Sequence, residues 1–330
     1  RRPPRSTLDR SSAASDVYKR QYRTEDNVRI LITGGAGFHG SHITEKWVTD
    51  GHDVTILNTY SDEAAKNISS YTPDVRVVWG SVTDEEIVEK TSRNQEVIVH
   101  LAAHINVDES LSVPHRFLDV NIGGTLNILE AVRRTGARLI FASSCEAYGH
   151  AVESPVKESA ELRPYSPYAA SKAAADRMCF AYSNSFGVDV TIVRPSNVYG
   201  ERQKSGRDGA VIPIFTNLAK VGKSLKVFGT GQQRREYTHV TDIVQAYDLI
   251  LRRDDLSGLA VNVGSGQTPS IVEIASFIAE RAGVDVTHEP PRPGEVPGFH
   301  LDSSLIRSYG YEPKVEFWDG LSCYLDSTLS

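Results

Sequence analysis

The chain has 330 residues, of which 40% are hydrophobic and 24% are charged, a composition typical of a water-soluble globular protein with room for two domains. Its net charge of −6 provides no basic surface for nucleic acid, and its apolar runs are much shorter than the roughly 18–20 residues of a membrane-spanning helix. The 3 cysteines are too few and too scattered for a disulfide framework or a zinc site, which indicates a reducing cytoplasm.

Residues 1–27 differ in composition from the rest of the chain. They are rich in Arg and Ser, include Pro3 and Pro4, and show neither apolar periodicity nor the apolar core of a secretory signal. We interpret them as a disordered tail or an artefact and exclude them from the predicted fold.

The first predicted elements are a strand, a glycine turn and a helix. Val28–Thr33 is a β-branched apolar run, and Gly34, Gly37 and Gly40 follow it before an amphipathic helix that ends near Thr49. Glycine suits a turn where the backbone approaches a pyrophosphate, and the N–H groups that open the helix can bind the phosphate oxygens. This order of elements predicts a dinucleotide site.

The second predicted strand, Asp53–Leu57, ends at Asn58. An asparagine there can bind the ribose hydroxyls of a dinucleotide, although an acidic residue is more usual at this position. No arginine follows closely to bind a 2′-phosphate, which favours NAD over NADP. The alternative is that Asn58 only caps the turn.

Two further strands are predicted at Val75–Trp79 and Glu96–His100. Small residues after the latter, such as Ala102, suit a close approach of backbone to a cofactor. His100 and His104 have the spacing of a zinc-binding helix, but Leu101 occupies the position that needs a glutamate. We therefore expect no metal site.

A long helix is predicted from Pro114 to Arg134, followed by a fifth strand, Arg138–Ala142. Asn121 lies within the helix, where it could orient the surroundings of Lys172. Ser144 follows the strand at the edge where open α/β sheets bind ligands, so it could hydrogen-bond a substrate hydroxyl. A serine-rich turn without function fits that stretch equally well.

Tyr168 and Lys172 begin a predicted helix, Tyr168–Phe186, and lie four residues apart on one face of it. We expect the lysine ammonium to lower the pKa of the phenol from its ordinary value of about 10, so that Tyr168 can exchange a proton with an alcohol. The alternative is an ordinary pair of amphipathic side chains.

The remaining elements break the regular alternation of strand and helix. The predicted strands are Val188–Val193, Leu225–Phe228, Glu236–Val240 and Ala260–Val263. The predicted helices are Ala210–Val221 and Asp242–Arg252. A third helix opens with the capping box Ser270-x-x-Glu273 and ends near Ala282. We predict an α/β fold with a doubly wound parallel sheet at 28–195, to which 235–263 returns. A smaller lobe would comprise 196–234 and 264–330.

The chain from Val28 onward resembles the extended short-chain dehydrogenase/reductases, in their sugar-nucleotide epimerase/dehydratase branch. The order and spacing of eight segments carry the resemblance: TGGAGFHG at 33–40, HLAA at 100–103, SSCEAYG at 143–149, SPYAASK at 166–172, RPSNVYG at 194–200, REYTHV at 235–240, NVGSG at 262–266 and RPGE at 292–295.

The resemblance implies a role for each matching residue. The implied catalytic residues are Tyr168 as acid and base, Lys172, Ser144 and Glu146. The implied NAD-binding residues are Gly34, Gly37, Phe38, His39, Gly40, Asn58, Ser81, Val82, Ala102, Asn121, Tyr168 and Lys172. The implied nucleotide-sugar contacts are Asn197, Arg235 and Arg292, since a guanidinium binds phosphate oxygens in pairs. The family's enzymes also imply a homodimer paired through the two long helices.

The implied reaction is 4-epimerisation of a UDP-hexose or UDP-hexuronic acid through a transient 4-keto sugar. A 4,6-dehydratase, a UDP-glucuronate decarboxylase, a reductase and a nucleotide sensor are the alternatives. Asn58 and Ser81 stand where the family usually has Asp, and His39 replaces an aliphatic residue of the turn. Cys145 stands where dehydratases carry the acid for the leaving hydroxyl, whereas Glu146 keeps a lyase possible.

Overall fold

The fold is taken from a computed structural model, which describes residues 27–151, 153–203, 210–291, 298 and 300–329. The expected tail at 1–27 thus lies almost entirely outside the described residues. The polar, glycine-containing sequence at 201–209 also predicts a loop, which the structure describes only as far as residue 203.

Seven parallel strands form the main sheet, in the order β10-β6-β5-β4-β1-β2-β3. The strands are β1 Arg29–Thr33, β2 Asp53–Asn58, β3 Arg76–Trp79, β4 Val97–His100, β5 Arg138–Ala142, β6 Val190–Pro195 and β10 Ala260–Val263. The order of strands along the chain reverses between β1 and β4, which is where open α/β sheets bind their ligands. The predicted fold class is confirmed.

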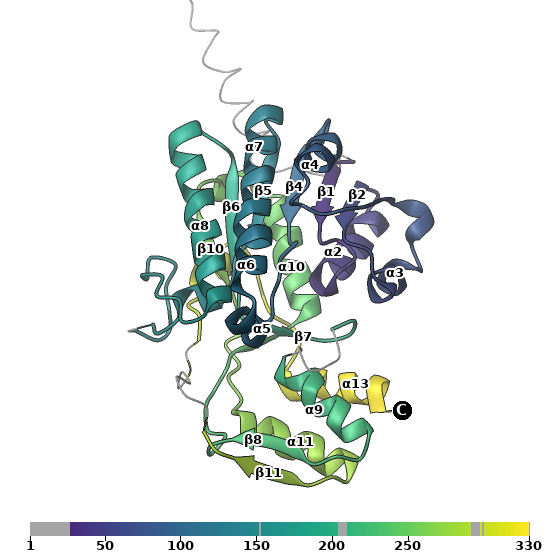
Figure 1. Cartoon of the computed structure of the whole chain (residues 1–330), viewed down its shortest axis with the longest axis vertical. Coiled ribbons are helices and arrows are strands. Elements are labelled where there is room, and N and C mark those ends of the chain that lie inside the picture. The colour runs from purple at the N-terminus through teal and green to yellow at the C-terminus, as the bar shows by residue number, and fades with distance from the viewer. Residues whose placement is uncertain (1–26, 152, 204–209, 292–297, 299, 330) are drawn as a thin grey trace, which may run out of the picture.

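Helices cover both faces of this sheet (Figure 1). The helices that follow the strands are α2 Phe38–Thr49, α3 Asp62–Ile68, α4 Glu85–Ser92, α5 Val107–Ser112, α6 Pro114–Phe117, η2 Leu118–Gly124, α7 Thr125–Thr135, α8 Pro167–Phe186 and α10 Val240–Leu251, with short 3-10 turns η1 Thr72–Asp74, η3 Cys145–Tyr148 and η4 Asp254–Leu256. One buried apolar cluster joins the sheet to α2 and α10 through Trp47 and Tyr247, and another joins it to α7 and α8 through Leu129 and Cys179.

A second group of elements lies beyond the carboxyl ends of the strands, at the bottom of Figure 1. Its elements are β8 Leu225–Phe228, β11 Val286–Glu289, α9 Val211–Lys220, α11 Ile271–Ala282 and α13 Phe317–Leu329. They share one apolar cluster that includes Phe215, Ile274 and Leu321. Between the two groups, β7 Asn197–Tyr199 pairs with β9 Tyr237–His239, and α12 Ser304–Ser308 packs against β10.

Local signals in the sequence set several helix ends. Ser270 and Glu273 form the predicted capping box of α11, in which the Ser270 hydroxyl accepts from the Glu273 N–H and the Glu273 carboxylate accepts from the Ser270 N–H. Gly136 ends α7 at a φ of 73°, the left-handed conformation that favours glycine just after a helix. At the start of α8, the Ser166 hydroxyl accepts from the N–H of Ala169 at 3.1 Å.

The helix predicted from Pro114 to Arg134 is not one regular α-helix. Its middle, Leu118–Gly124, is a π-helical turn between α6 and α7. Gly124 lies against Val82, where an added Cβ would come within 2.5 Å of a Val82 methyl carbon. The Asn121 side chain is tied to neighbouring elements, so a close contact and tertiary hydrogen bonds hold the widened turn.

Among the described residues, no helix combines the length and the apolar character that crossing a membrane requires.

Candidate active site

The glycine turn after β1 is shaped to receive a phosphate. Gly34 has a φ of 74°, and a Cβ on Gly40 would lie 2.1 Å from the Gly34 carbonyl oxygen, so a side chain at either position is excluded. Helix α2 begins at Phe38, and within the described chain no side chain caps it. Its first N–H groups therefore point to the turn without a side-chain acceptor, as an anion site at a helix N-terminus requires.

The loop after β4 forms the neighbouring wall. An added Cβ on Gly34 would lie 2.8 Å from the Ala102 nitrogen, so the turn and this loop are in direct contact.

Asn58 ends β2, and its side-chain oxygen accepts from the N–H of Ala36 at 3.2 Å. The Asn58 side chain thus holds the turn, as the capping alternative proposed, while lying at the edge where the ribose is expected.

Ser81 and Val82 follow β3 at the same edge. The Ser81 hydroxyl lies 2.8 Å from that of Thr83, and the Val82 carbonyl accepts from Asn127 at 3.0 Å. The predicted cofactor residues after β1, β2, β3 and β4 are thereby brought to one edge of the sheet.

Tyr168 lies in the first turn of α8, with only 8% of its surface exposed. Burial raises the pKa of its phenol, a hydrogen bond with Ser144 opposes the rise, and the nearby Glu146 carboxylate adds to it. Ser144 itself lies at the end of β5, where it caps η3 by accepting from the Glu146 N–H at 3.1 Å. Ser144 is thus close enough to Tyr168 to affect the pKa of its phenol.

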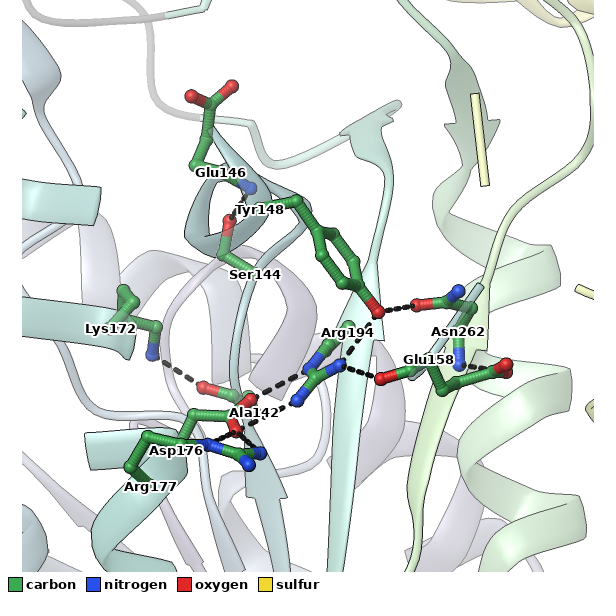
Figure 2. Close-up of polar contacts among 10 residues, drawn as sticks. All are labelled: Ala142, Ser144, Glu146, Tyr148, Glu158, Lys172, Asp176, Arg177, Arg194 and Asn262. Atoms are coloured by element: carbon green, nitrogen blue, oxygen red, sulfur yellow. Dashed lines mark hydrogen bonds and ion pairs between the residues drawn. The ribbon is translucent and has the colours of Figure 1, made fainter. Parts of the chain in front are cut away.

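The expectation that Lys172 lowers the pKa of Tyr168 is wrong for this structure. The Lys172 ammonium turns into the protein and donates to the Ala142 carbonyl at 2.5 Å (Figure 2). It lies 5.0 Å from the centre of the Phe141 ring. Burial lowers the pKa of Lys172 to about 8. Helical spacing does place Tyr168 and Lys172 near one face of the helix. The position of the Lys172 ammonium, however, is set by its contacts with the Phe141 ring and the Ala142 carbonyl of β5.

Glu146 and Cys145 differ in what they can do chemically. Burial raises the pKa of the Glu146 carboxyl, although Arg235 opposes the rise, so Glu146 can hold a proton closer to neutrality than an ordinary glutamate. Burial also raises the pKa of the Cys145 thiol far above its usual value, which leaves a protonated thiol that is a poor acid. Figure 2 shows the Glu146 carboxylate directed away from Lys172 and Asp176.

Of the expected nucleotide-sugar residues, Asn197 begins β7, and Arg235 lies two residues before β9. Asn197 is paired in register with Tyr237, and its amide donates to the Glu236 carbonyl at 3.1 Å. Arg235 directly precedes Glu236 and is close enough to Glu146 to affect its pKa. Arg292 lies outside the described residues.

His39 follows Phe38 in the first turn of α2. Burial, together with the charges of His42 and Lys172, lowers the pKa of His39 to about 4, so its imidazole is neutral at physiological pH. His39 therefore adds no positive charge to the region around Lys172.

A buried polar cluster beneath the site was not predicted (Figure 2). The Asp176 carboxylate, one turn after Lys172, accepts two hydrogen bonds from Arg194 at 2.8 and 2.9 Å. Arg194 also donates to the Tyr148 hydroxyl at 2.7 Å, which in turn donates to Asn262 at 2.7 Å. The predicted strand Val188–Val193 stopped one residue before Arg194, whereas β6 extends to Pro195 and buries the Arg194 side chain.

Comparison with known proteins places these features in one family. The profile of the NAD dependent epimerase/dehydratase family matches residues 30–264. A UDP-glucose 4-epimerase of Mycolicibacterium smegmatis is 33% identical over 89% of this chain and 96% of its own. A UDP-glucuronic acid decarboxylase 1 of Xenopus tropicalis is 34% identical over 90% of this chain and 71% of its own.

Among solved structures, a dTDP-glucose 4,6-dehydratase of Streptomyces venezuelae, crystallised with NAD bound, superposes with a TM-score of 0.84. It is 31% identical, and the match covers 90% of this chain and 96% of that one. Relatives with three different activities are therefore about equally similar to this chain.

Proposed function

Because the chain belongs to the NAD-dependent epimerase/dehydratase family, which acts on nucleotide sugars, we propose that it is a nucleotide-sugar 4-epimerase. The substrate would be a UDP-hexose or a UDP-hexuronic acid. The observation that carries this proposal is the buried Tyr168–Ser144 pair, in a site where the residue after Ser144 is a protonated thiol instead of a carboxylic acid.

The proposed proton transfer uses Tyr168 and Ser144. Ser144 hydrogen-bonds the sugar hydroxyl and the phenol, and Tyr168 takes the hydroxyl proton as the sugar carbon is oxidised and returns it on reduction. Burial removes competing water from the phenol, since Tyr168 is only 8% exposed. Lys172 holds a buried positive charge beneath this pair.

NAD fits the glycine turn, where Gly34 and Gly40 leave room for the backbone to approach a pyrophosphate and the first turn of α2 offers its N–H groups. NAD held there would supply the acceptor for a hydride from the sugar carbon and the donor for its return. We propose Asn58, Ser81, Val82 and Ala102 as further contacts along the sheet edge, with Asn121 positioning α8.

We propose that the nucleotide end of the substrate is held by Asn197, Arg235 and Arg292 between the sheet domain, 28–195 with 235–263, and the smaller lobe, 196–234 and 264–330. A guanidinium suits this role because it stays charged and binds two phosphate oxygens at once. Anchoring there would keep the oxidised sugar from leaving while it rotates within the site.

Glu146 supports a second candidate, a decarboxylase or dehydratase that starts with the same oxidation. Its carboxyl has a raised pKa and lies near Tyr168 and Arg235, so it could move a proton on the sugar carbon skeleton. The epimerase remains preferred because Cys145 cannot supply the acid that dehydration requires.

The test is to incubate the purified protein with UDP-glucose, UDP-glucuronate or dTDP-glucose without added cofactor and to follow the products by proton NMR. The proposal predicts the 4-epimer of at least one UDP sugar. Formation of a 4-keto-6-deoxy sugar or a pentose in its place would establish the lyase.

A further inference from the structure

His100, at the end of β4, is a buried imidazole that the proposed reaction does not use. It is 1% exposed, and both of its ring nitrogens have partners. Nδ1 lies 2.7 Å from the Thr33 hydroxyl, at the end of β1, and Nε2 lies 3.0 Å from the Thr125 hydroxyl, just after the π turn. One ring therefore connects the strand before the glycine turn to the helix that carries Asn121.

The neighbours of this ring fix the direction of each hydrogen bond. The Thr125 hydroxyl donates to the Asn121 carbonyl at 2.6 Å, so it can only accept from His100, whose Nε2 must carry the proton. Nδ1 of the neutral ring then accepts from the Thr33 hydroxyl, whose oxygen accepts in turn from the Ala102 N–H at 3.3 Å. The hydrogen bonds therefore all run in one direction, each residue donating to the next: Ala102 to Thr33, Thr33 to His100, His100 to Thr125, and Thr125 to Asn121. No two donors face each other.

The far end of this chain of hydrogen bonds reaches the catalytic helix. The Asn121 amide group donates to the Ser171 hydroxyl at 2.8 Å, and Ser171 donates to the Tyr168 carbonyl at 2.7 Å. Asn121 also holds the loop after β4, because it accepts from the His104 N–H at 2.8 Å and donates to the His104 carbonyl at 2.9 Å. The Asn121 side chain thus uses its amide group and its carbonyl oxygen to hold the loop after β4 and the first turns of α8.

We propose that His100 is a positioning residue that ties the glycine turn to the Asn121 turn and so sets the spacing of the cofactor cleft. The ring acts through Thr33 and Ala102 on one wall and through Thr125 and Asn121 on the other. It must be neutral to do so, because a second ring proton would leave two donors, His100 and Thr33, facing each other. The inference rests on the proposed placement of NAD, and is independent of which reaction follows.

The test compares the affinity of the full-length protein for NAD among variants, by calorimetric titration. His100→Phe keeps a flat ring and loses both hydrogen bonds, so we expect its dissociation constant for NAD to rise about tenfold or more, the effect of one or two lost neutral hydrogen bonds. His100→Gln can still accept from Thr33 and donate to Thr125, and we expect it to stay within about threefold of the wild type. Near-normal NAD affinity in His100→Gln, together with weak binding in His100→Phe, would show that the hydrogen bonds of His100 matter and not only the space its ring fills.

Ile98→Ala is the matched control, because Ile98 is buried two residues earlier on the same face of β4 and belongs only to the apolar cluster. It should lower the melting temperature without changing the affinity for NAD. If His100→Phe does not fold, Thr125→Val breaks the same chain of hydrogen bonds with little change of shape. We expect Thr125→Val to weaken NAD binding by itself, and, when His100→Phe folds, to add nothing in a double variant that carries both changes.

Wild-type affinity for NAD in both His100→Phe and Thr125→Val would overturn the inference, as would additive effects in the double variant. Nitrogen NMR gives an independent readout, since the His100 ring should be the neutral Nε2–H form between pH 5 and 8 (the range about the ordinary histidine pKa). The Nδ1–H form would contradict the assigned directions. An unmodified protein that binds no NAD would instead refute the cofactor placement itself.

Discussion

Tyr168 is set apart from an ordinary surface tyrosine by burial and by its nearness to Ser144. Burial raises the pKa of the phenol, so the resting side chain is protonated and ready to donate a hydrogen bond. Removal of the hydroxyl oxygen should therefore abolish the proton transfer while leaving the apolar ring contact with Phe117, at 6.4 Å between centroids, in place.

For Tyr168→Phe we expect turnover to fall by about 10²–10⁴-fold, the usual contribution of a general acid–base group. NAD affinity and melting temperature should stay near those of the unmodified protein, because no hydrogen bond that anchors the turn is lost. Turnover would be measured by NMR on the substrate that the unmodified protein accepts. Activity within tenfold of the unmodified protein would remove Tyr168 from its role.

His100 also predicts how stability depends on pH. Burial lowers the pKa of His100 to about 3, so the unfolded chain takes up a proton below its ordinary pKa of about 6.5 while the folded chain does not. The free energy of unfolding should therefore fall as pH drops from about 6.5 toward 3, with His100 contributing about 1.4 kcal/mol per pH unit. Urea unfolding at pH 7 and pH 5 measures the slope, and His100→Gln should reduce it. An unchanged slope in that variant would contradict the burial argument.

At the scale of elements, α8 is fixed to the sheet by charge as well as by apolar contact. Asp176 is fully buried and Arg194 is 1% exposed, and they make a two-pronged ion pair between α8 and β6. Burial alone would raise the pKa of Asp176, but the hydrogen bonds from Arg194 outweigh burial and lower it. The pair holds α8, whose first turn carries Tyr168, against β6, the neighbour of the strand that precedes Ser144.

Asp176→Ala should lower the free energy of unfolding by about 3–5 kcal/mol, because it leaves the Arg194 charge buried without its partner. Glu161→Ala is the control, since Glu161 pairs with Arg163 at the surface, where its side chain is 76% exposed. Its effect should stay below about 1 kcal/mol. Equal losses in the two variants, measured by urea unfolding, would show that the buried pair does not anchor α8.

Elements coded by short-range signals could be predicted from the sequence. The glycine turn and the capping box of α11 need only neighbouring residues, and both are present. The π turn at 118–124 could not be predicted, because Asn121 is held by residues from two other segments. The position of Lys172 likewise depends on Ala142, 30 residues earlier in the chain, so helical spacing alone gave the wrong effect on Tyr168.

For the whole molecule, α7 and α8 present an apolar outer surface. Leu118, Leu126, Phe180 and Phe186 are each at least 40% exposed on η2, α7 and α8, which lie side by side in Figure 1. Exposed apolar side chains gathered on neighbouring helices suit a contact with a second copy of the chain. A homodimer through these helices is therefore our proposal for the assembly.

Sedimentation equilibrium should give twice the mass of one chain for the unmodified protein. Replacing Leu126 and Phe180 together by Glu should give a folded single chain, because four charges would be buried in the symmetric contact. Val221→Glu is the control, since Val221 is 65% exposed on the smaller lobe and should leave the dimer intact. A single chain in the unmodified protein would refute the proposal.

At the scale of the whole molecule, the sequence correctly predicted the sheet and the family, but it did not determine which reaction the protein catalyses. Relatives that epimerise, dehydrate or decarboxylate are all about one third identical to this chain. The outcome of the reaction depends on where a sugar carbon lies relative to Tyr168 and Glu146, which spacing along a sequence does not encode. Arg292, expected at the nucleotide end, is outside the described residues.

The most direct test of the central claim is to run the reaction of UDP-glucose and of UDP-glucuronate in D₂O and to record the proton NMR spectrum of the products. A 4-epimerase moves the C4 hydrogen without releasing it to solvent, so we predict a 4-epimer that carries no deuterium on any carbon. Deuterium at C5, with either loss of the carboxylate or a 4-keto-6-deoxy product, would contradict the account and identify Glu146 as the group to test next.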